Sequence, residues 1–589
     1  MKMKRQPLTL LLCSAFLMLT VLFFSPMEVF LANTKEITVP FRNVWWIQLL
    51  FSLACAGVLG GLALALPGRA GLIAGGVFLG GGLACYIQIL FLNGGMPASV
   101  GDGMNVSREG QILNLVIWIV IILAVLLAVV LLSKKKPKQL NFAMRLIACA
   151  LIAMQATGFV TSALTTDTSG LQLEHNLSKE GEFELSADTN VVVFVIDSAD
   201  TSFFGEMLEA YPEMNEVLSG WVWYPNATSR YSRTYPSFTY LLTGADCRFD
   251  KLFQTYVGEA FAGSRFLPNM AEAGTDIRIF TSDPQFVASS ADAYVANSVP
   301  FRAGDIQNLR LPVLEKNLIK MALYKTAPYL FKLRFKYDTS VINTESFAPG
   351  YSSRDDDFHR DLVPAEMTAT DQYGKAFRVY YLQGIHPGVD WDENLHVVSV
   401  PGWDEQLAST PVEDITAPKL HVSLRGSMRN VELYIQKMKE LGIYDKATII
   451  VTADHGRYGL RRPQELEATH TLCPTILIKY AGSDTTQPLQ ICEAPVSHED
   501  LFAAVEQGFG LPLSGTGSGK SPAEIPEGEE RERLFYLTAY RTNVKGEVAL
   551  LEYAIKGDAR DLANWEATGN WWDIVYSANI VSSEEFSGF

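Results

Sequence analysis

Hydrophobic residues form five long runs in the first part of the chain and only short runs after it. The long runs lie at residues 8–31, 44–66, 70–93, 112–133 and 140–164. Each is close to the ~20 residues that a helix needs to cross a bilayer. The pattern therefore predicts a five-helix transmembrane bundle over residues 1–165. Further spans follow the long first run, which favours an uncleaved helix over a signal peptide.

The short apolar runs begin after a polar segment, residues 166–190, which we expect to be a linker. Four of these runs are predicted strands, at 191–196, 277–281, 377–382 and 447–452. Helical stretches such as 425–441 lie between them. This alternation indicates an α/β fold with a mostly parallel central sheet flanked by helices. We expect residues 191–589 to form one such domain.

Basic residues lie in alternate connections between the spans, and this predicts the orientation. They precede the first span, separate the second from the third, and separate the fourth from the fifth: Lys2, Lys4, Arg5, Arg69, Lys134, Lys135, Lys136 and Lys138. Because Lys and Arg accumulate in cytoplasmic loops, the N-terminus is predicted to be cytoplasmic. Five crossings then place the α/β domain outside the cytoplasm. The expected localisation is the plasma membrane, with several passes.

Composition narrows the range of functions. The formal net charge of −16 argues against an electrostatic nucleic-acid binder. The spans contain no series of ionisable residues, so the bundle is predicted to be an anchor and not a transporter. Of the seven cysteines, three lie outside the spans, at Cys247, Cys473 and Cys492. They allow at most one disulfide and indicate no thiolate metal cluster.

Acidic and imidazole side chains follow two of the predicted strands. Asp197 and Asp200 end the run VVVFVIDSAD, and Asp454 and His455 end the run ATIIVTADHG. Ligands of open α/β sheets lie at the carboxyl ends of the strands. A carboxylate beside an imidazole suits a divalent cation of the Zn or Mn type. Alone, Asp-His-Gly could equally be an ordinary turn, and Asp200 could cap a helix.

A third motif, TYPSFTYLLTG, supplies a hydroxyl group. Thr234 comes two residues before Pro236, and a helical apolar pattern follows. Proline is favoured in the first turn of a helix, so Thr234 is predicted to lie at a helix N-terminus. The free backbone N–H groups there suit a phosphate or sulfate. Together with the acidic strand ends, this hydroxyl predicts an active site.

These motifs resemble the alkaline phosphatase superfamily, in its sulfatase-like branch. TYPSFTYLLTG is similar to the sulfatase signature, whose nucleophile falls on Thr234. VVVFVIDSAD resembles the first metal-ligand strand, which implies Asp197 as a ligand. ATIIVTADHG resembles the later metal motif, which implies Asp454 and His455. YYLQGIHPG resembles a segment with a substrate-binding histidine, here His386.

Two departures from the sulfatase pattern direct the interpretation. Sulfatases need Cys or Ser for conversion to formylglycine and an Arg that follows it, whereas this chain has Thr234 and Phe238. Threonine cannot form formylglycine. With a five-span anchor, the chain instead resembles lipoteichoic acid synthases, phosphoglycerol transferases and phosphoethanolamine transferases. Arg233 matches a basic residue before the nucleophile in the synthases, and His470 is similar to a late histidine of the phosphoethanolamine transferases.

The resemblance implies an enzyme that moves a phospholipid head group to a cell-envelope glycan or lipid acceptor through a phospho-threonine. It implies one divalent ion, Mn or Zn with Mg or Ca as alternatives. Thr234 is the expected nucleophile and also a metal ligand. Three residues are expected to contact substrate: Arg233, His386 and His470. Two alternatives stay open: a sulfatase-like hydrolase of phosphate, phosphonate or sulfate esters, and a non-catalytic envelope protein on a decayed enzyme fold.

Overall fold

The computed structural model divides the chain into two compact units, which are described separately. The helical unit comprises residues 1–173 and 302–348, and the α/β unit comprises residues 174–301 and 349–589. Within these units the structure describes residues 6–34, 41–93, 108–166, 175–300, 310–335, 351–386, 391–396, 420–456, 472–512, 519–540 and 547–574.

The helical unit contains the five predicted spans, which confirms that part of the fold class. The helices long and apolar enough to cross a membrane cover Pro7–Ala32, Phe41–Ala65, Gly68–Leu92, Arg108–Lys135 and Pro137–Thr165. The first consists of α1 (Pro7–Leu19), a π-helical turn (Thr20–Phe24) and α2 (Ser25–Ala32). The others are α3 (Phe41–Ala65), α4 (Gly68–Ile87) continued by a π-helical turn (Gln88–Leu92), α5 (Arg108–Lys135) and α6 (Pro137–Thr165).

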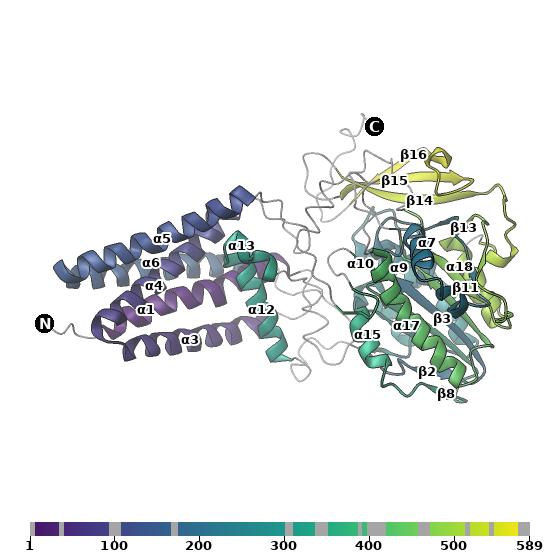
Figure 1. Cartoon of the computed structure of the whole chain (residues 1–589), viewed down its shortest axis with the longest axis horizontal. Coiled ribbons are helices and arrows are strands. Elements are labelled where there is room, and N and C mark those ends of the chain that lie inside the picture. The colour runs from purple at the N-terminus through teal and green to yellow at the C-terminus, as the bar shows by residue number, and fades with distance from the viewer. Residues whose placement is uncertain are drawn as a thin grey trace. The chain divides into compact units, whose positions relative to one another are not determined.

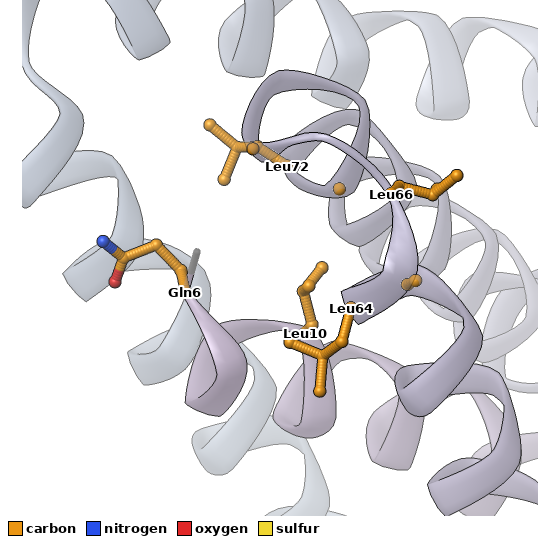
Figure 2. Close-up of a pocket in the computed structure, with 8 residues that line it drawn as sticks. Gln6, Leu10, Leu64, Leu66 and Leu72 are labelled. Atoms are coloured by element: carbon orange, nitrogen blue, oxygen red, sulfur yellow. The ribbon is translucent and has the colours of Figure 1, made fainter. Parts of the chain in front are cut away.

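Small residues allow α1 to approach its neighbours closely. A Cβ on Gly82 of α4 would lie 2.6 Å from the ring of Phe16, and one on Gly60 of α3 would lie 2.8 Å from Ser14 Oγ. Glycine at these positions therefore permits the tight helix contacts typical of membrane bundles. A small recess between α1, α3 and α4 is lined mainly by leucines, with Gln6 at its edge (Figure 2).

Two helices from the middle of the chain also belong to the helical unit. They are α12 (Leu311–Thr326) and α13 (Tyr329–Lys332), and they lie across one end of the bundle (Figure 1). We expected this stretch in the α/β domain. It joins the helical unit because α12 buries an apolar stripe against α1–α3, from Leu314 to Tyr324.

The α/β unit is built on a seven-stranded sheet with the order β12-β4-β11-β10-β3-β9-β6. The strands are β12 (Gln490–Ile491), β4 (Val222–Trp223), β11 (Ile476–Lys479), β10 (Ala447–Thr452), β3 (Thr189–Ile196), β9 (Lys375–Leu382) and β6 (Thr275–Phe280). Pairing is parallel from β10 through β3 and β9 to β6, and β11 alone runs against its neighbours. The mostly parallel sheet predicted from the sequence is confirmed.

The continuous apolar sequence of β3 reflects cover on both faces of the sheet. Val191, Val193 and Val195 face one core, and Val192, Phe194 and Ile196 face the other. The first core includes side chains from α9 (Thr234–Thr243), α10 (Phe253–Gly263), α11 (Phe266–Glu272) and α18 (His498–Phe509). The second includes side chains from α7 (Thr201–Ala210), α15 (Asp355–Leu362) and α17 (Leu420–Glu440). This is the pattern expected of a strand in a parallel sheet.

The α/β unit begins before residue 191, so the expected linker is shorter. Within residues 166–190, β1 (His175–Leu177) pairs with β7 (Ser298–Pro300), and β2 (Glu184–Ser186) pairs with β8 (Thr368–Thr370). Polar sequence suggested a linker, but these backbone groups find partners far along the chain. A three-stranded antiparallel sheet near the C-terminus adds β14 (Glu532–Tyr540), β15 (Glu547–Lys556) and β16 (Trp565–Asp573).

One buried carboxyl predicts how stability depends on pH. Glu182 is 6% exposed, and its Oε1 has no hydrogen-bond partner among the described residues. Burial raises the pKa of Glu182 to about 7, with Lys179 lowering it and Asp361 raising it. Because the pKa of Glu182 is higher in the folded protein than in the unfolded chain, folding favours the protonated carboxyl. The stability that comes from this preference is fully present at low pH and is lost as pH rises through about 7.

We therefore expect Glu182→Gln to stabilise the protein at pH 8 by about 2–3 kcal/mol and to have little effect below pH 4.5. The measurement is thermal unfolding of the purified full chain in detergent at several pH values. The control is Glu180→Gln, which removes the same charge from an exposed neighbour and should change stability by less than about 0.5 kcal/mol. Equal stability of Glu182→Gln and wild type at pH 8 would contradict the prediction.

Candidate active site

The chemistry-bearing residues of two strands meet at one edge of the central sheet. Strands β3 and β10 are parallel neighbours, with Val195 opposite Thr452. Their carboxyl ends are therefore adjacent, and they deliver Asp197 on one side and Asp454 with His455 on the other. This is the edge at which open α/β sheets bind ligands, and the sequence predicted it.

Asp197, Asp454 and His455 form a group that can hold a metal ion. Each offers one ligand atom, and these atoms lie within 4.8 Å of one another. All three side chains are buried, with exposures of 3%, 0% and 5%. Two carboxylates and an imidazole at this spacing match the donor set of Zn or Mn sites.

Asp454 has one oxygen fully engaged and one that remains available. Its Oδ1 accepts from the backbone N–H of Ser198 at 3.1 Å and of His455 at 2.9 Å. Its Oδ2 is buried with no hydrogen-bond partner in the described parts of the chain, and lies 3.5 Å from His455 Nε2. Burial raises the pKa of Asp454 to about 6, against these hydrogen bonds. An orphaned buried carboxylate oxygen of this kind fits a bound cation, which would supply the missing partner.

The tautomer of His455 follows from its neighbour. Nδ1 lies 2.6 Å from the carbonyl oxygen of Gly456, which can only accept, so Nδ1 carries the proton and Nε2 is bare. Burial lowers the pKa of His455 to about 4, so the imidazole is neutral at pH 7. A bare Nε2, with its ring fixed by a carbonyl at the other nitrogen, is what a metal-ligating histidine requires.

Thr234 lies beside this group at the N-terminus of α9, as the sequence predicted. Its Oγ1 is 3.2 Å from His455 Nε2, and because Nε2 is bare, the hydroxyl donates. Arg233 is the N-cap, and α9 ends at Gly244 with φ of 72°. Pro236 falls in the first turn, where its missing N–H costs no helical hydrogen bond. The positive end of the helix therefore lies at the Thr234 hydroxyl.

Ser198 holds the two acidic residues in place. Its Oγ donates to Asp197 Oδ1 at 2.7 Å while its N–H donates to Asp454. Its φ of 58° is positive, a conformation that costs a residue with a side chain about 1–2 kcal/mol. Backbone strain at this point is offset by the hydrogen bonds that order the ligand group.

Tyr381 is a residue of the site that our sequence reasoning missed. Its hydroxyl donates to Asp197 Oδ2. Burial raises the pKa of Tyr381 well above its usual value, the charges of Asp197 and Asp454 raise it further, and a hydrogen bond with Thr234 opposes the shift. Its ring packs edge-on against Phe238, with centroids 5.2 Å apart. Burial raises the pKa of Asp197, and Asp454 raises it further, while His386, His455 and the Tyr381 hydrogen bond lower it.

The structure brings two of the three expected substrate residues near this group. Arg233 donates from Nε to Thr538 Oγ1 at 3.3 Å, and its charge contributes to lowering the pKa of His455. His386 follows β9, and its charge lowers the pKa of both Asp197 and Asp454. His470 lies outside the described residues.

Two further buried residues, Asp200 and His498, hold the frame of the site. Asp200 caps α7, accepting from Ser202 N at 2.9 Å. His498 is buried, and its Nε2 lies 3.0 Å from the carbonyl of Ala453, the residue before Asp454. Its Nδ1 accepts from the N–H of Arg230 at 3.3 Å. His498 thereby links the end of β10 to the loop that leads to Thr234.

No protein-family profile and no curated protein sequence matches this chain. Solved structures do match part of it. A phosphonate monoester hydrolase from Silicibacter pomeroyi is 15% identical, over 64% of this chain and 88% of that one, with a TM-score of 0.34. A protein in the alkaline phosphatase superfamily from Vibrio parahaemolyticus is 12% identical, over 65% and 79%, with a TM-score of 0.35.

The lipoteichoic acid synthase of Listeria monocytogenes is 10% identical, over 65% of this chain and 88% of that one, with a TM-score of 0.34. The superfamily of the Vibrio parahaemolyticus protein is the one that the motifs of this chain resemble. Identities and TM-scores this low carry no argument about function. The function of this chain is therefore inferred from the geometry of its site.

Removing one metal ligand should weaken metal binding strongly. We expect Asp454→Asn to raise the Kd for Mn²⁺ or Zn²⁺ by about 100-fold or more, since even residues that only support a ligand contribute 10–100-fold. Isothermal titration of the full chain in detergent measures this. The matched control is Asp200→Asn, because Asp200 is equally buried at 0% exposure and caps α7. A similar loss in both variants would show that Asp454 is no ligand.

The Tyr381 hydroxyl should increase the affinity of the same site for its metal ion. We expect Tyr381→Phe to raise the metal Kd by about 10-fold, because Asp197 loses a hydrogen bond that orients it. The control is Tyr380→Phe on the same strand, whose hydroxyl donates instead to the carbonyl of Glu182 and should leave the Kd unchanged. Unaltered metal affinity in Tyr381→Phe would remove Tyr381 from the site.

Proposed function

We propose that this protein is a metal-dependent phosphotransferase that moves a phospholipid head group to a cell-envelope acceptor through a phospho-threonine. One observation carries the proposal: a threonine hydroxyl at a helix N-terminus lies 3.2 Å from the bare nitrogen of His455, within a buried group of two carboxylates and an imidazole. A hydroxyl is a weak nucleophile until it is activated. Here its neighbours supply both activation and phosphate binding.

The metal would be held by Asp197, Asp454 and His455, with Thr234 as a further ligand. When bound, a divalent cation supplies positive charge that makes the Thr234 hydroxyl more acidic and polarises a phosphoryl oxygen. Mn²⁺ and Zn²⁺ are the ions that fit mixed carboxylate and imidazole donors.

In the first step Thr234 Oγ1 forms a bond to the phosphorus of a phospholipid. The bond between phosphorus and the diacylglycerol oxygen breaks, the threonine proton passes to water, and the diacylglycerol oxygen takes up a proton. His386 is the proposed donor of that proton. The N-terminal N–H groups of α9 and the guanidinium of Arg233 stabilise the charge on the phosphoryl oxygens.

In the second step an acceptor hydroxyl bonds to the phosphorus. The bond from phosphorus to Thr234 Oγ1 breaks, the acceptor loses its proton, and Thr234 regains one. The head group has then moved from lipid to acceptor with no net change in bonds to phosphorus. Water in place of the acceptor would make the same site a hydrolase. The fate of an adduct on Thr234 distinguishes hydrolysis from transfer.

The proposed setting follows from the helical unit. Five helices are long and apolar enough to cross a membrane, and the basic residues between them favour a cytoplasmic N-terminus. The α/β unit then lies outside the cytoplasm, where the outer-leaflet lipids and envelope polymers are found. The proposed donor and acceptor are both available there.

The test is a covalent adduct on Thr234. We expect the full chain, with Mn²⁺ and a fluorescent phosphatidylglycerol or phosphatidylethanolamine, to gain a phosphoglycerol or phosphoethanolamine group on Thr234, seen by peptide mass spectrometry. Thr234→Ala should abolish the adduct and lower turnover by about 10³-fold or more. Ser237→Ala is the matched control, because Ser237 is an aliphatic hydroxyl one turn into α9 and donates to the carbonyl of Tyr231.

The outcome decides between the readings. An adduct that persists until an alcohol acceptor is added supports transfer. Release of head groups by water alone, dependent on Thr234, supports the hydrolase. If no metal binds and neither the adduct nor turnover is found, the protein is not an enzyme of this class and the non-catalytic alternative takes its place.

A further inference from the structure

The segment that contains α12 and α13 interrupts the α/β unit and returns to the helical unit. The chain passes from α6 into the α/β unit, comes back at residues 302–348, and then leaves again. Its described part covers residues 310–335. The proposed transferase activity does not require residues 302–348 to return to the helical unit. The packing of α12 and α13 therefore needs an explanation of its own.

The buried face of α12 packs against one end of the bundle. Leu314, Leu318, Met321 and Tyr324 recur at helical spacing and join a single core with residues of the membrane helices. Their partners include Met27, Phe30 and Leu31 at the end of the first span and Phe41 and Val44 at the start of α3. The helix therefore lies at the bundle end where the first span finishes and the second begins.

Polar contacts attach the same segment to three other points at that end. Lys325 pairs with Glu28 in the last turns of the first span at 2.8 Å. The side chain of Asn93, just after the third span, donates to the carbonyl of Lys325 at 3.0 Å. The N–H of Tyr329 donates to Asn114 Oδ1, near the start of α5, at 3.0 Å. The first, third and fourth spans thus contact α12 or α13 close to one end, and the second shares a buried core with α12.

Aromatic residues mark this end as a membrane interface. Trp45 and Trp46 stand in the first turns of α3 and are 37% and 44% exposed. Trp118 of α5 donates from Nε1 to Gln88 at 2.9 Å, in the same network as Asn114. Tryptophan and tyrosine gather where the acyl chains meet the head groups. Helices α12 and α13 lie at this end of the bundle (Figure 1).

The outward side of α13 is apolar and continues a lipid-facing surface. Leu330 and Phe331 are 51% and 41% exposed. Ile112 and Leu113, near the start of α5, are 56% and 61% exposed, and α13 contacts that helix. Large apolar side chains on a short exposed helix are unfavourable in water, but they suit a bilayer.

The outward side of α12 has a different composition. Lys316 and Lys320 are separated by one helical turn, on the side away from the Leu314 stripe, and Lys316 is exposed. Lysines on the polar face of an amphipathic helix extend their ammonium groups toward phospholipid phosphates. A segment with apolar residues at one end and lysines along its outer side matches the composition of interfacial helices.

We propose that residues 311–332 form an interfacial hairpin whose occupant is the lipid leaflet at the bundle end where the first span finishes and the second begins. Leu330 and Phe331 insert among the lipids, and the lysine side of α12 faces the head groups and water. The hairpin gives the chain a second attachment to the membrane, independent of α6.

The test places a fluorophore at Phe331. In the full chain, the three accessible cysteines, Cys55, Cys149 and Cys492, are replaced by alanine, and Phe331→Cys is labelled with NBD. The protein is reconstituted in vesicles of phosphatidylglycerol and phosphatidylethanolamine. Quenching is measured with iodide in the water and with lipids that carry a nitroxide near the head group. Leu330→Cys repeats the measurement at a second exposed position.

Two matched positions calibrate the result. Lys316→Cys should be open to iodide. Leu123→Cys, on α5 and 56% exposed, should be quenched by lipid nitroxides and not by iodide. We expect labels at 331 and 330 to be quenched by the shallow nitroxide and to show several-fold less iodide quenching than the label at 316.

Three results would overturn the proposal. Iodide quenching at 331 and 330 equal to that at 316 would place these residues in water. Protection from both quenchers would mean that protein covers them. Iodide quenching at 123 would show that the bundle itself does not lie in the bilayer.

Discussion

The burial of two carboxylates side by side is the constraint on which the site depends. Asp197 and Asp454 lie within ligand distance of each other and are almost completely excluded from water. Two like charges in such a place are costly unless a cation or hydrogen bonds balance them. The fold supplies donors from Ser198 and Tyr381 but leaves Asp454 Oδ2 without a protein partner in the described parts of the chain. The remaining imbalance is what suits this group to a bound metal ion.

The surrounding architecture serves to hold this unstable group in one arrangement. Strands β3 and β10 are covered on both faces, so their ends cannot shift without disturbing two cores. Two local features restrict movement of the site residues further. One is the left-handed backbone at Ser198, and the other is His498, which links β10 to the loop before Thr234. Preorganisation of this kind is how a site avoids rearranging when charge develops on a substrate.

Much of this could be predicted from the sequence, for a physical reason. Asp197, Asp454 and Thr234 each follow or begin an element with a strong local signal, so spacing along the chain was enough to place them. Tyr381 was missed because a tyrosine near the end of a buried strand resembles a core residue. Only the register between β3 and β9, which pairs Val195 with Tyr381, brings its hydroxyl to Asp197.

The position of α12 could not be predicted for a related reason. Its apolar stripe was visible in the sequence, but an amphipathic pattern specifies that a face is buried and not which unit buries it. Tertiary contacts with residues about 280 positions earlier, such as Leu318 with Phe30 in one core, decide the matter. The same limit applies to β1 and β2, whose partners lie far along the chain.

The excursion of residues 302–348 also bears on how such a chain can arise. Its two units are not consecutive modules, because each is made of two separated stretches of sequence. Recombination that exchanged the first 165 residues alone would leave the Leu314 stripe facing a foreign bundle. Likewise, one proteolytic cut after α6 would not free the α/β unit, which would stay attached through α12. A change in the anchor that alters this packing surface would therefore need a matching change in α12.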